Sequence, residues 1–220
     1  MYAYCGNDPV MHTDTTGDFF GPIALMTIVV FCIVTSVEIY DTIYQSISED
    51  NLSNNSKIDD TTSTLIEDQG DYDYFDYGFF DVGYNGCEAV AIHNARTLLG
   101  EKSMLSDVIY RIQKTGGMVA LGLFGSNPNK IGAVLDSYGM TYEKVGLNEM
   151  TKPGVYVISY WGEPYENGLR PIHTVTVYYN GTDYGTYNYA PYNCEIGYWP
   201  QTHPRFYASD YIVGYYLGGN

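Results

Sequence analysis

The charged residues of this 220-residue chain are distributed very unevenly, and this restricts how the chain can fold. Residues 1–80 contain 14 acidic residues and one basic residue, whereas residues 81–220 contain 12 acidic and nine basic residues. One continuous globular domain would not be expected to change its charge balance so sharply. The sequence therefore predicts a composite chain whose two parts differ in structure.

The composition supports at least one buried core and argues against a nucleic-acid partner. Apolar residues make up 45% of the chain, which is ample for a domain of this length. A formal net charge of −16 repels a phosphate backbone, so we expect no nucleic-acid partner. The cysteines, Cys5, Cys32, Cys87 and Cys194, form no CxxC pair, and we expect no disulfide framework, no metal site and no cofactor.

An uncharged run at residues 19–37 predicts a hydrophobic helix over residues 22–40. At about 1.5 Å per residue the run would cover roughly 28 Å, which approaches the thickness of the bilayer core. The run has no flanking Lys or Arg and contains three hydroxyl side chains, which makes membrane insertion marginal. A membrane-contacting helix and a buried hydrophobic helix are therefore both open.

Residues 41–78 are predicted to form an acidic linker in front of a domain that covers residues 79–220. The stretch 45–76 is polar and acidic and has few apolar residues at periodic positions. This composition is typical of a solvated segment. We therefore expect little fixed structure between residues 45 and 76.

The first 21 residues contain a motif, YAYCGNDPVMHTDTTGDFFG, that resembles the end of the core domain of Rhs (YD-repeat) proteins. The family pattern runs roughly YxYxxNxPxxxxDPxG, and the matching residues are Tyr2, Tyr4, Asn7, Asp8, Pro9, Val10, Asp14 and Gly17. Thr15 stands where the family usually has Pro. The resemblance implies that the rest of the chain is a variable toxin or effector region. Such a region is secreted or delivered to a target cell, and a cognate immunity protein is its expected partner.

A glycine-punctuated turn at residues 81–86 precedes a predicted helix that begins near Cys87. Apolar residues recur at helical spacing over Ala91–Leu98, and Gly100 is a typical stop signal. Unpaired N–H groups and the helix dipole at a helix start lower the pKa of a thiol. We therefore expect Cys87 to be a reactive thiolate, with a small buried apolar residue as the alternative.

Two β-rich runs, at residues 154–160 and 171–179, predict strands. The second run is followed by Asn180-Gly181, a pair that favours a two-residue hairpin turn. A longer loop of four residues is the alternative. The two loop lengths give different registers on the returning strand.

The hairpin brings a histidine close to an asparagine in either register. With the two-residue turn His173 faces Asn188, and with the four-residue loop Asn188 lies one diagonal step away. The Asn188 amide oxygen could then accept a hydrogen bond from the imidazole. This would leave the other ring nitrogen of His173 available to take a thiol proton.

Over residues 81–192 the chain resembles papain-like peptidases, most closely the bacteriocin-processing peptidase domains. NGCEAVAIHNARTLL matches their motif NGCGxxAxxxxL, and HTVTVYYNGTDYGTYNYAP matches HxVVV followed by a turn and DP. The resemblance implies an α+β papain-like cysteine peptidase fold, in which an N-terminal nucleophile helix packs on an antiparallel sheet. It assigns Cys87 as nucleophile, His173 as general base and Asn188 as the orienting residue.

The chain departs from this family at the position that usually helps to bind the oxyanion. Asp81 stands six residues before Cys87, where the family usually has Gln, and a carboxylate there would repel the developing negative charge. Asn85, or the backbone N–H groups of Gly86 and Cys87, could replace it. The sequence does not choose among these donors.

The sequence thus predicts a toxin or effector with thiol hydrolase activity on an amide of a protein or peptide substrate. The product could come from peptide cleavage or from deamidation through a thioester intermediate. The alternative is a non-enzymatic or membrane-acting effector with a degenerate papain-like domain. Replacement of Cys87 by Ala separates the two, because toxicity that persists would exclude the thiol mechanism.

Overall fold

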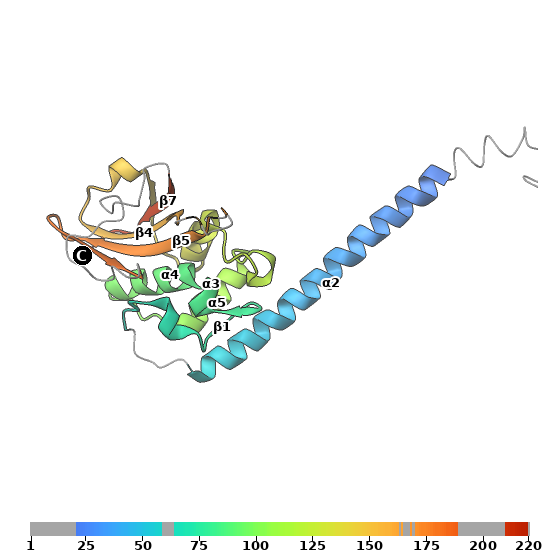
Figure 1. Ribbon diagram of the computed structural model, residues 1–220, viewed down its shortest axis with the longest axis horizontal. Coiled ribbons are helices and arrows are strands. Elements are labelled where there is room, and N and C mark those ends of the chain that lie inside the picture. Colours follow the sequence, from blue (N-terminus) through green and yellow to red (C-terminus); the bar gives the residue numbers. More distant parts are fainter. Residues whose placement is uncertain are drawn as a thin grey trace, which may run out of the picture. The chain divides into compact units, whose positions relative to one another are not determined.

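The computed structural model describes residues 21–58, 64–162, 164, 168, 170–188 and 210–219 (Figure 1). The chain divides into two compact units, Met1–Ser46 and Ile47–Asn220. Almost all of the Rhs-like motif at residues 1–21 lies outside the described residues, as do Cys5 and Cys194. The helices and strands are α2 (Gly21–Ile58), η3 (Gln69–Tyr72), β1 (Asp76–Tyr77), β2 (Phe80–Asp81), α3 (Val82–Asn85), α4 (Cys87–Leu98), α5 (Leu105–Lys114), η4 (Ala120–Gly122), η5 (Pro128–Lys130), α6 (Ile131–Ser137), β3 (Glu143–Val145), η6 (Leu147–Glu149), β4 (Gly154–Trp161), β5 (Ile172–Tyr179), β6 (Tyr184–Tyr187) and β7 (Tyr211–Tyr216).

The predicted hydrophobic helix is present as the first part of α2, which continues to Ile58. The large apolar side chains between Val29 and Val37 are exposed, with 67% of Phe31 accessible to solvent. The side chains of residues 19–28 lie outside the described part of the chain. Within that part, the helices lack a segment both long and apolar enough to cross a membrane.

The expectation of little fixed structure between residues 45 and 76 is wrong for the described residues of this stretch, 45–58 and 64–76. In this stretch α2 continues to Ile58, and η3 and β1 follow. Three of the polar side chains here, those of Ser48, Asn51 and Asn55, are buried and form hydrogen bonds. Asn55 exchanges two hydrogen bonds with the backbone of Asp76, at 2.8 and 2.9 Å, and Asn94 on α4 does the same with Ile66, both at 2.7 Å. Because each amide pairs both a backbone donor and a backbone acceptor, these side chains fix segments without apolar periodicity.

The folded unit is a mixed α+β structure, which confirms the coarse fold class. Five antiparallel strands lie in the order β3-β7-β4-β5-β6, and β1 and β2 form a separate hairpin. Helix α4 packs along β5 (Figure 1). Thr176 on β5 donates to the backbone oxygen of Ala91 on α4 at 2.7 Å, whereas Val175 and Val177 belong to the core on the opposite face of the sheet. The even-numbered residues of β5 therefore face α4.

The predicted helix after residue 86 is confirmed as α4. Ala91 and Ala95 are fully buried, so the small side chains allow the close approach to the sheet. The helix ends before Gly100, whose φ of +77° is the left-handed conformation of a C-terminal cap. Its N–H donates to Thr97, and the N–H of Glu101 donates to Arg96, as in a Schellman motif.

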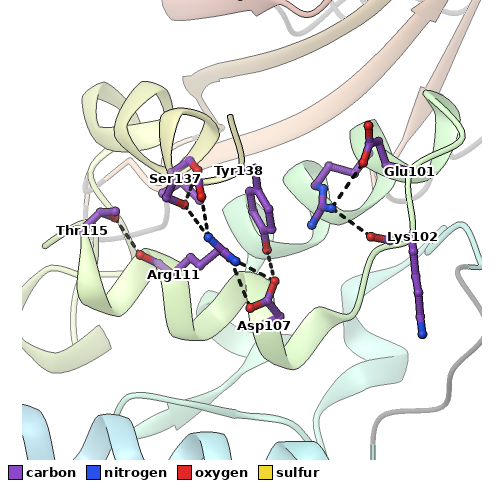
Figure 2. A network of polar contacts seen from close by, with 9 residues as sticks. Glu101, Lys102, Asp107, Arg111, Thr115, Ser137 and Tyr138 are labelled. Atoms are coloured by element: carbon purple, nitrogen blue, oxygen red, sulfur yellow. Dashed lines mark hydrogen bonds and ion pairs between the residues drawn. The ribbon is translucent and has the colours of Figure 1, made fainter. Parts of the chain in front are cut away.

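Tyr138, which follows α6, fastens this helix to α4 and α5. Its ring lies between the guanidinium groups of Arg96 and Arg111, which are 3.6 and 4.0 Å from the ring centroid. Its hydroxyl donates to Asp107 at 2.8 Å, and Arg111 reaches both Asp107 and Ser137 (Figure 2). These contacts hold the helical layer together on the side of α4 away from its N-terminus.

The predicted strands are present as β4 and β5, but the prediction of a two-residue turn after β5 is wrong. The loop has four residues, Asn180 to Asp183, and Tyr179 pairs with Tyr184. The Asn180 side chain accepts from the N–H groups of Thr182 and Asp183, both at 2.8 Å. This side chain closes a longer loop than the Asn-Gly dipeptide alone favours.

Candidate active site

Cys87 is placed at the start of α4 by a very short helix in front of it. Asp81 caps α3, since its carboxylate accepts from the N–H of Tyr84 at 2.8 Å. Gly86 joins the two helices, and a Cβ there would lie 2.7 Å from the backbone of Val82. Only glycine therefore fits the junction, and the next residue begins α4.

The sulfur of Cys87 contacts β5 next to His173. It lies 3.9 Å from the carbonyl oxygen of Ile172, and Thr174 is close enough to act against the rise in the pKa of the thiol. The neighbouring carbonyl, that of Pro171, accepts from Gly162 at the β4 side. Because successive carbonyls of a strand point to opposite edges, Ile172 points its carbonyl to the other edge.

That other edge is the one on which β6 lies. Among the described residues β6 ends at Tyr187, opposite Thr176, so its pairing stops short of Ile172 and Thr174. The sulfur of Cys87 thus occupies the edge of β5 at the level of His173.

The imidazole of His173 is held by a backbone carbonyl. Its Nε2 lies 2.6 Å from the carbonyl oxygen of Asn188. A carbonyl can only accept, so Nε2 carries the proton and Nδ1 carries the lone pair of the neutral ring. The ring packs edge-to-face on Tyr160 at 5.8 Å, on the sheet face opposite α4. Within the described residues no hydrogen bond joins this ring to the sulfur of Cys87.

The electrostatics differ from the sequence-based expectation at Cys87. Burial, and secondarily the charge of Glu88, raise the pKa of the half-buried Cys87 thiol to about 11, against the opposing effects of Thr174 and of the Glu88 backbone. Burial lowers the pKa of His173, against the opposing effects of Asn188 and Asp68. The expected lowering of the thiol pKa is therefore wrong, and near neutral pH the thiol and the imidazole are both uncharged.

Asn188 lies beside His173, but its side chain has a different partner from the predicted one. The Asn188 amide oxygen accepts from the backbone N–H of Gln69, and its amide nitrogen donates to the side chain of Gln69, both at 3.0 Å. The carbonyl of Asn188, and not its amide, binds the imidazole. Sequence reasoning missed Gln69, which lies in the predicted linker and carries no periodic or motif signal.

Most of the predicted oxyanion donors are occupied. Asp81 serves as the cap of α3, the Asn85 amide nitrogen donates to Gly122 at 2.6 Å, and the N–H of Gly86 donates to Val82 at 2.8 Å. The N–H of Cys87 is the first of α4. It points from the N-terminal end of α4, where the helix dipole favours negative charge. Of the predicted donors, Cys87 N–H fits an oxyanion best.

Helix α4 carries two further titratable groups, Glu88 and His93. Burial raises the pKa of Glu88 to about 8, and one of its carboxyl oxygens has no hydrogen-bond partner within the described residues. His93 contacts the backbone oxygen of Thr64 at 2.8 Å. Across the described ranges, Cys, His, Asp and Glu form no cluster of three that could hold a metal ion.

The raised pKa of the thiol predicts how Cys87 reacts with iodoacetamide. Because only the thiolate reacts, the alkylation rate should rise about tenfold per pH unit between about pH 7 and pH 10. Peptide mapping by mass spectrometry would measure the alkylation of Cys87 separately from that of the exposed Cys32. In the urea-unfolded chain the rate at Cys87 should level off near about pH 9. A folded-state rate that levels off below pH 8 would contradict the burial of this thiol.

The comparisons with known proteins add no relative to this geometry. Searches against models of protein families, curated protein sequences and solved structures find no match to the chain. The candidate site is therefore defined by its own residues, which are Cys87 on α4, His173 on β5, Asn188 after β6, and Gln69 on η3.

Proposed function

We propose that residues 79–220 form a papain-like thiol hydrolase that acts on an amide of a protein or peptide. One observation carries the proposal: the sulfur of Cys87 lies 3.9 Å from the carbonyl oxygen of Ile172, the residue that directly precedes His173 in β5. The imidazole meanwhile receives its orientation from the carbonyl of Asn188. Cys87 is the nucleophile, His173 the base, and Asn188 the orienting residue in this proposal.

The protonation states favour a general-base mechanism rather than a preformed ion pair. In this mechanism Nδ1 of His173 takes the proton of Cys87 as the sulfur attacks the amide carbon, which requires the imidazole to leave its packing on Tyr160 and turn toward the edge of β5. The C–N bond then breaks, the imidazolium gives its proton to the leaving amine, and a thioester forms. Water hydrolyses the thioester and restores the thiol. A peptide bond would yield a new amino terminus, and a Gln side chain would yield ammonia.

The N–H of Cys87 is the proposed oxyanion donor. It lies at the N-terminus of α4. Both this donor and the helix dipole would stabilise the negative charge that develops on the carbonyl oxygen of the substrate. A single preorganised donor typically contributes on the order of 3 kcal/mol to transition-state stabilisation. The carboxylate of Asp81, already engaged as the α3 cap, has no part in this step.

The biological setting of the proposal rests on the resemblance of the first 21 residues to Rhs proteins. It makes the chain a polymorphic toxin that is secreted or delivered to a target cell. A cognate immunity protein that blocks the site would be its partner. Membrane contact through residues 19–37 belongs to the same proposal, as a delivery function separate from catalysis.

The test compares the wild type with Cys87→Ala and Cys87→Ser in a bacterial host without an immunity protein. Wild-type expression should arrest growth, and both variants should abolish the arrest, because neither hydroxyl nor methyl can replace a thiol in this mechanism. Terminal labelling and mass spectrometry of the host proteins would identify new amino termini or conversion of amides to acids. Cys32→Ser is the matched control and should behave as the wild type. Growth arrest by Cys87→Ala would refute the thiol mechanism.

A non-enzymatic effector is the second candidate, and two observations favour it. The thiol of Cys87 has a raised pKa, and the donors on Asn85 and Gly86 are used within the fold. A degenerate papain-like domain would retain the packing without the chemistry. In that case growth arrest would persist in Cys87→Ala, and no new amino termini or deamidated side chains would appear in the host.

A further inference from the structure

The residue that orients His173 has an unusual backbone conformation. Strand β6 ends at Tyr187, and Asn188 follows with a φ of +62° and only 2% of its surface exposed. Asparagine tolerates this left-handed region better than other residues with a Cβ. The reversal turns the carbonyl of Asn188 toward the imidazole of His173, so the orientation of the ring depends on how firmly this one residue is held.

Gln69 holds Asn188 at both ends of its amide. Its backbone N–H donates to Asn188 Oδ1, and its side-chain oxygen accepts from Asn188 Nδ2, both at 3.0 Å. Two opposed hydrogen bonds between the same pair of residues fix the rotation of the Asn188 side chain. They therefore restrict the backbone turn that aims its carbonyl.

The same glutamine also reaches the segment that leads to Cys87. Its Nε2 donates to the carbonyl oxygen of Gly83 at 2.9 Å, within α3 and four residues before Cys87. Gln69 thus bonds on one side to the residue that orients the base, and on the other to the short helix that places the nucleophile. Its three hydrogen bonds span the candidate site.

We propose that Gln69 is a positioning residue that keeps the Asn188 carbonyl on the His173 imidazole and sets the spacing between the base and the nucleophile helix. The inference rests on the proposed function, since it assigns Gln69 a part in that reaction. Gln69 acts through Asn188 and touches neither substrate nor sulfur. The side chain of Asn188 has the role of a tether, and its backbone orients the ring.

The test uses the full chain and the Nε2–H proton of His173, observed by NMR and assigned by its absence in His173→Ala. In the wild type this buried, hydrogen-bonded proton should exchange slowly with water. Gln69→Ala removes two of the three hydrogen bonds, and its exchange should be at least about tenfold faster. Asn188→Gly retains the carbonyl and permits a positive φ, but it loses the amide contacts to Gln69. It should accelerate exchange to a similar extent.

Two comparisons make the result specific. The double variant should exchange no faster than Asn188→Gly alone, because Asn188→Gly already removes both hydrogen bonds between the two residues. Gln113→Ala deletes another buried amide, one that bonds to Ser48, and should leave the exchange within about threefold of the wild type. Thermal unfolding of all variants would show that the fold is kept.

The proposal is overturned if folded Asn188→Gly or folded Gln69→Ala retains wild-type protection of the His173 proton. It is also overturned if Gln113→Ala accelerates exchange as much as Gln69→Ala does. The measurement needs no substrate, so its failure is distinct from failure of the thiol hydrolase proposal. Growth arrest by Cys87→Ala would show that Gln69 has no role in a thiol reaction. The NMR result on the His173 proton would still show that Gln69 holds Asn188 in place.

Discussion

Glu88→Gln should make the protein several kcal/mol more stable than the wild type at pH 9 and leave its stability at pH 4 almost unchanged. The pKa of Glu88 rises from 4.5 to about 8 in the folded chain because the carboxyl group is buried, and the hydrogen bond to Ser126 offsets this only in part. Between these two values the folded state binds more protons than the unfolded state, so the free energy of unfolding falls as the pH rises. Over the whole interval the loss from this one group is on the order of 5 kcal/mol. A glutamine has no charge to desolvate and escapes the loss.

The measurement is urea unfolding of both proteins at several pH values between 4 and 9. The difference in free energy of unfolding should grow with pH through this window and level off above about pH 8. Glu101→Gln is the control, since the Glu101 side chain is 56% exposed and its ion pair with Arg96 is long at 3.7 Å. It should change stability by less than about 1 kcal/mol at every pH. A difference between Glu88→Gln and wild type that stays constant with pH would contradict the buried, protonated state of Glu88.

The same substitution should also change the reactivity of the neighbouring thiol. The charge of Glu88 is the second cause of the raised pKa of Cys87. Without that carboxylate the midpoint of the alkylation profile of Cys87 should move to lower pH, while burial keeps it above that of the unfolded chain. An unchanged midpoint would mean that the carboxyl group stays protonated throughout the titration.

Gly86→Ala should cost about 3 kcal/mol or more of stability and should pull Cys87 away from β5. The added methyl group would lie 2.7 Å from Cα, Cγ1 and the carbonyl oxygen of the fully buried Val82. Two of these atoms, Cα and the carbonyl oxygen, belong to the backbone of Val82. A rotation of the Val82 side chain therefore cannot relieve the overlap. The junction between α3 and α4 must open, and the N-terminus of α4 must move with it.

Urea unfolding and Cys87 alkylation at pH 8 would measure both consequences. The variant should unfold at lower urea concentration, and its thiol should react about tenfold faster than in the wild type because it is less buried. Gly185→Ala is the matched control, since its Cβ would meet no atom within 4 Å on strand β6. It should unfold within about 1 kcal/mol of the wild type. Normal stability in Gly86→Ala would show that the two helices are not as close as described.

The elements with local signals could be predicted from the sequence. Small apolar residues at helical spacing and Gly100 specify α4, and β-branched runs specify β4 and β5. The prediction of the turn length after β5 was wrong because the dipeptide rule considers only Asn180-Gly181. The Asn180 side chain instead accepts from two N–H groups further along and closes a loop of four residues.

The part of the site that could not be predicted from the sequence depends on contacts between segments far apart along the chain. Gln69 and Asn188 are separated by 119 residues, and the segment around Gln69 has no periodic apolar residues. The pKa of Cys87 could not be predicted either. The helix start argues for a lower value, but desolvation under β5 and the adjacent Glu88 outweigh it, and both effects require the tertiary structure.

The polar end of α2 bears on how the domain should be produced in recombinant form. A fragment begun at residue 79, where the charge balance changes, would lose Asn55, Ile66 and Gln69 together with the β1 strand. Soluble material of that length would carry an exposed Asn94 and an unsupported Asn188, and inactivity in an assay would say nothing about the chemistry. A fragment begun at Ile47, the boundary of the second compact unit, retains every one of these supports.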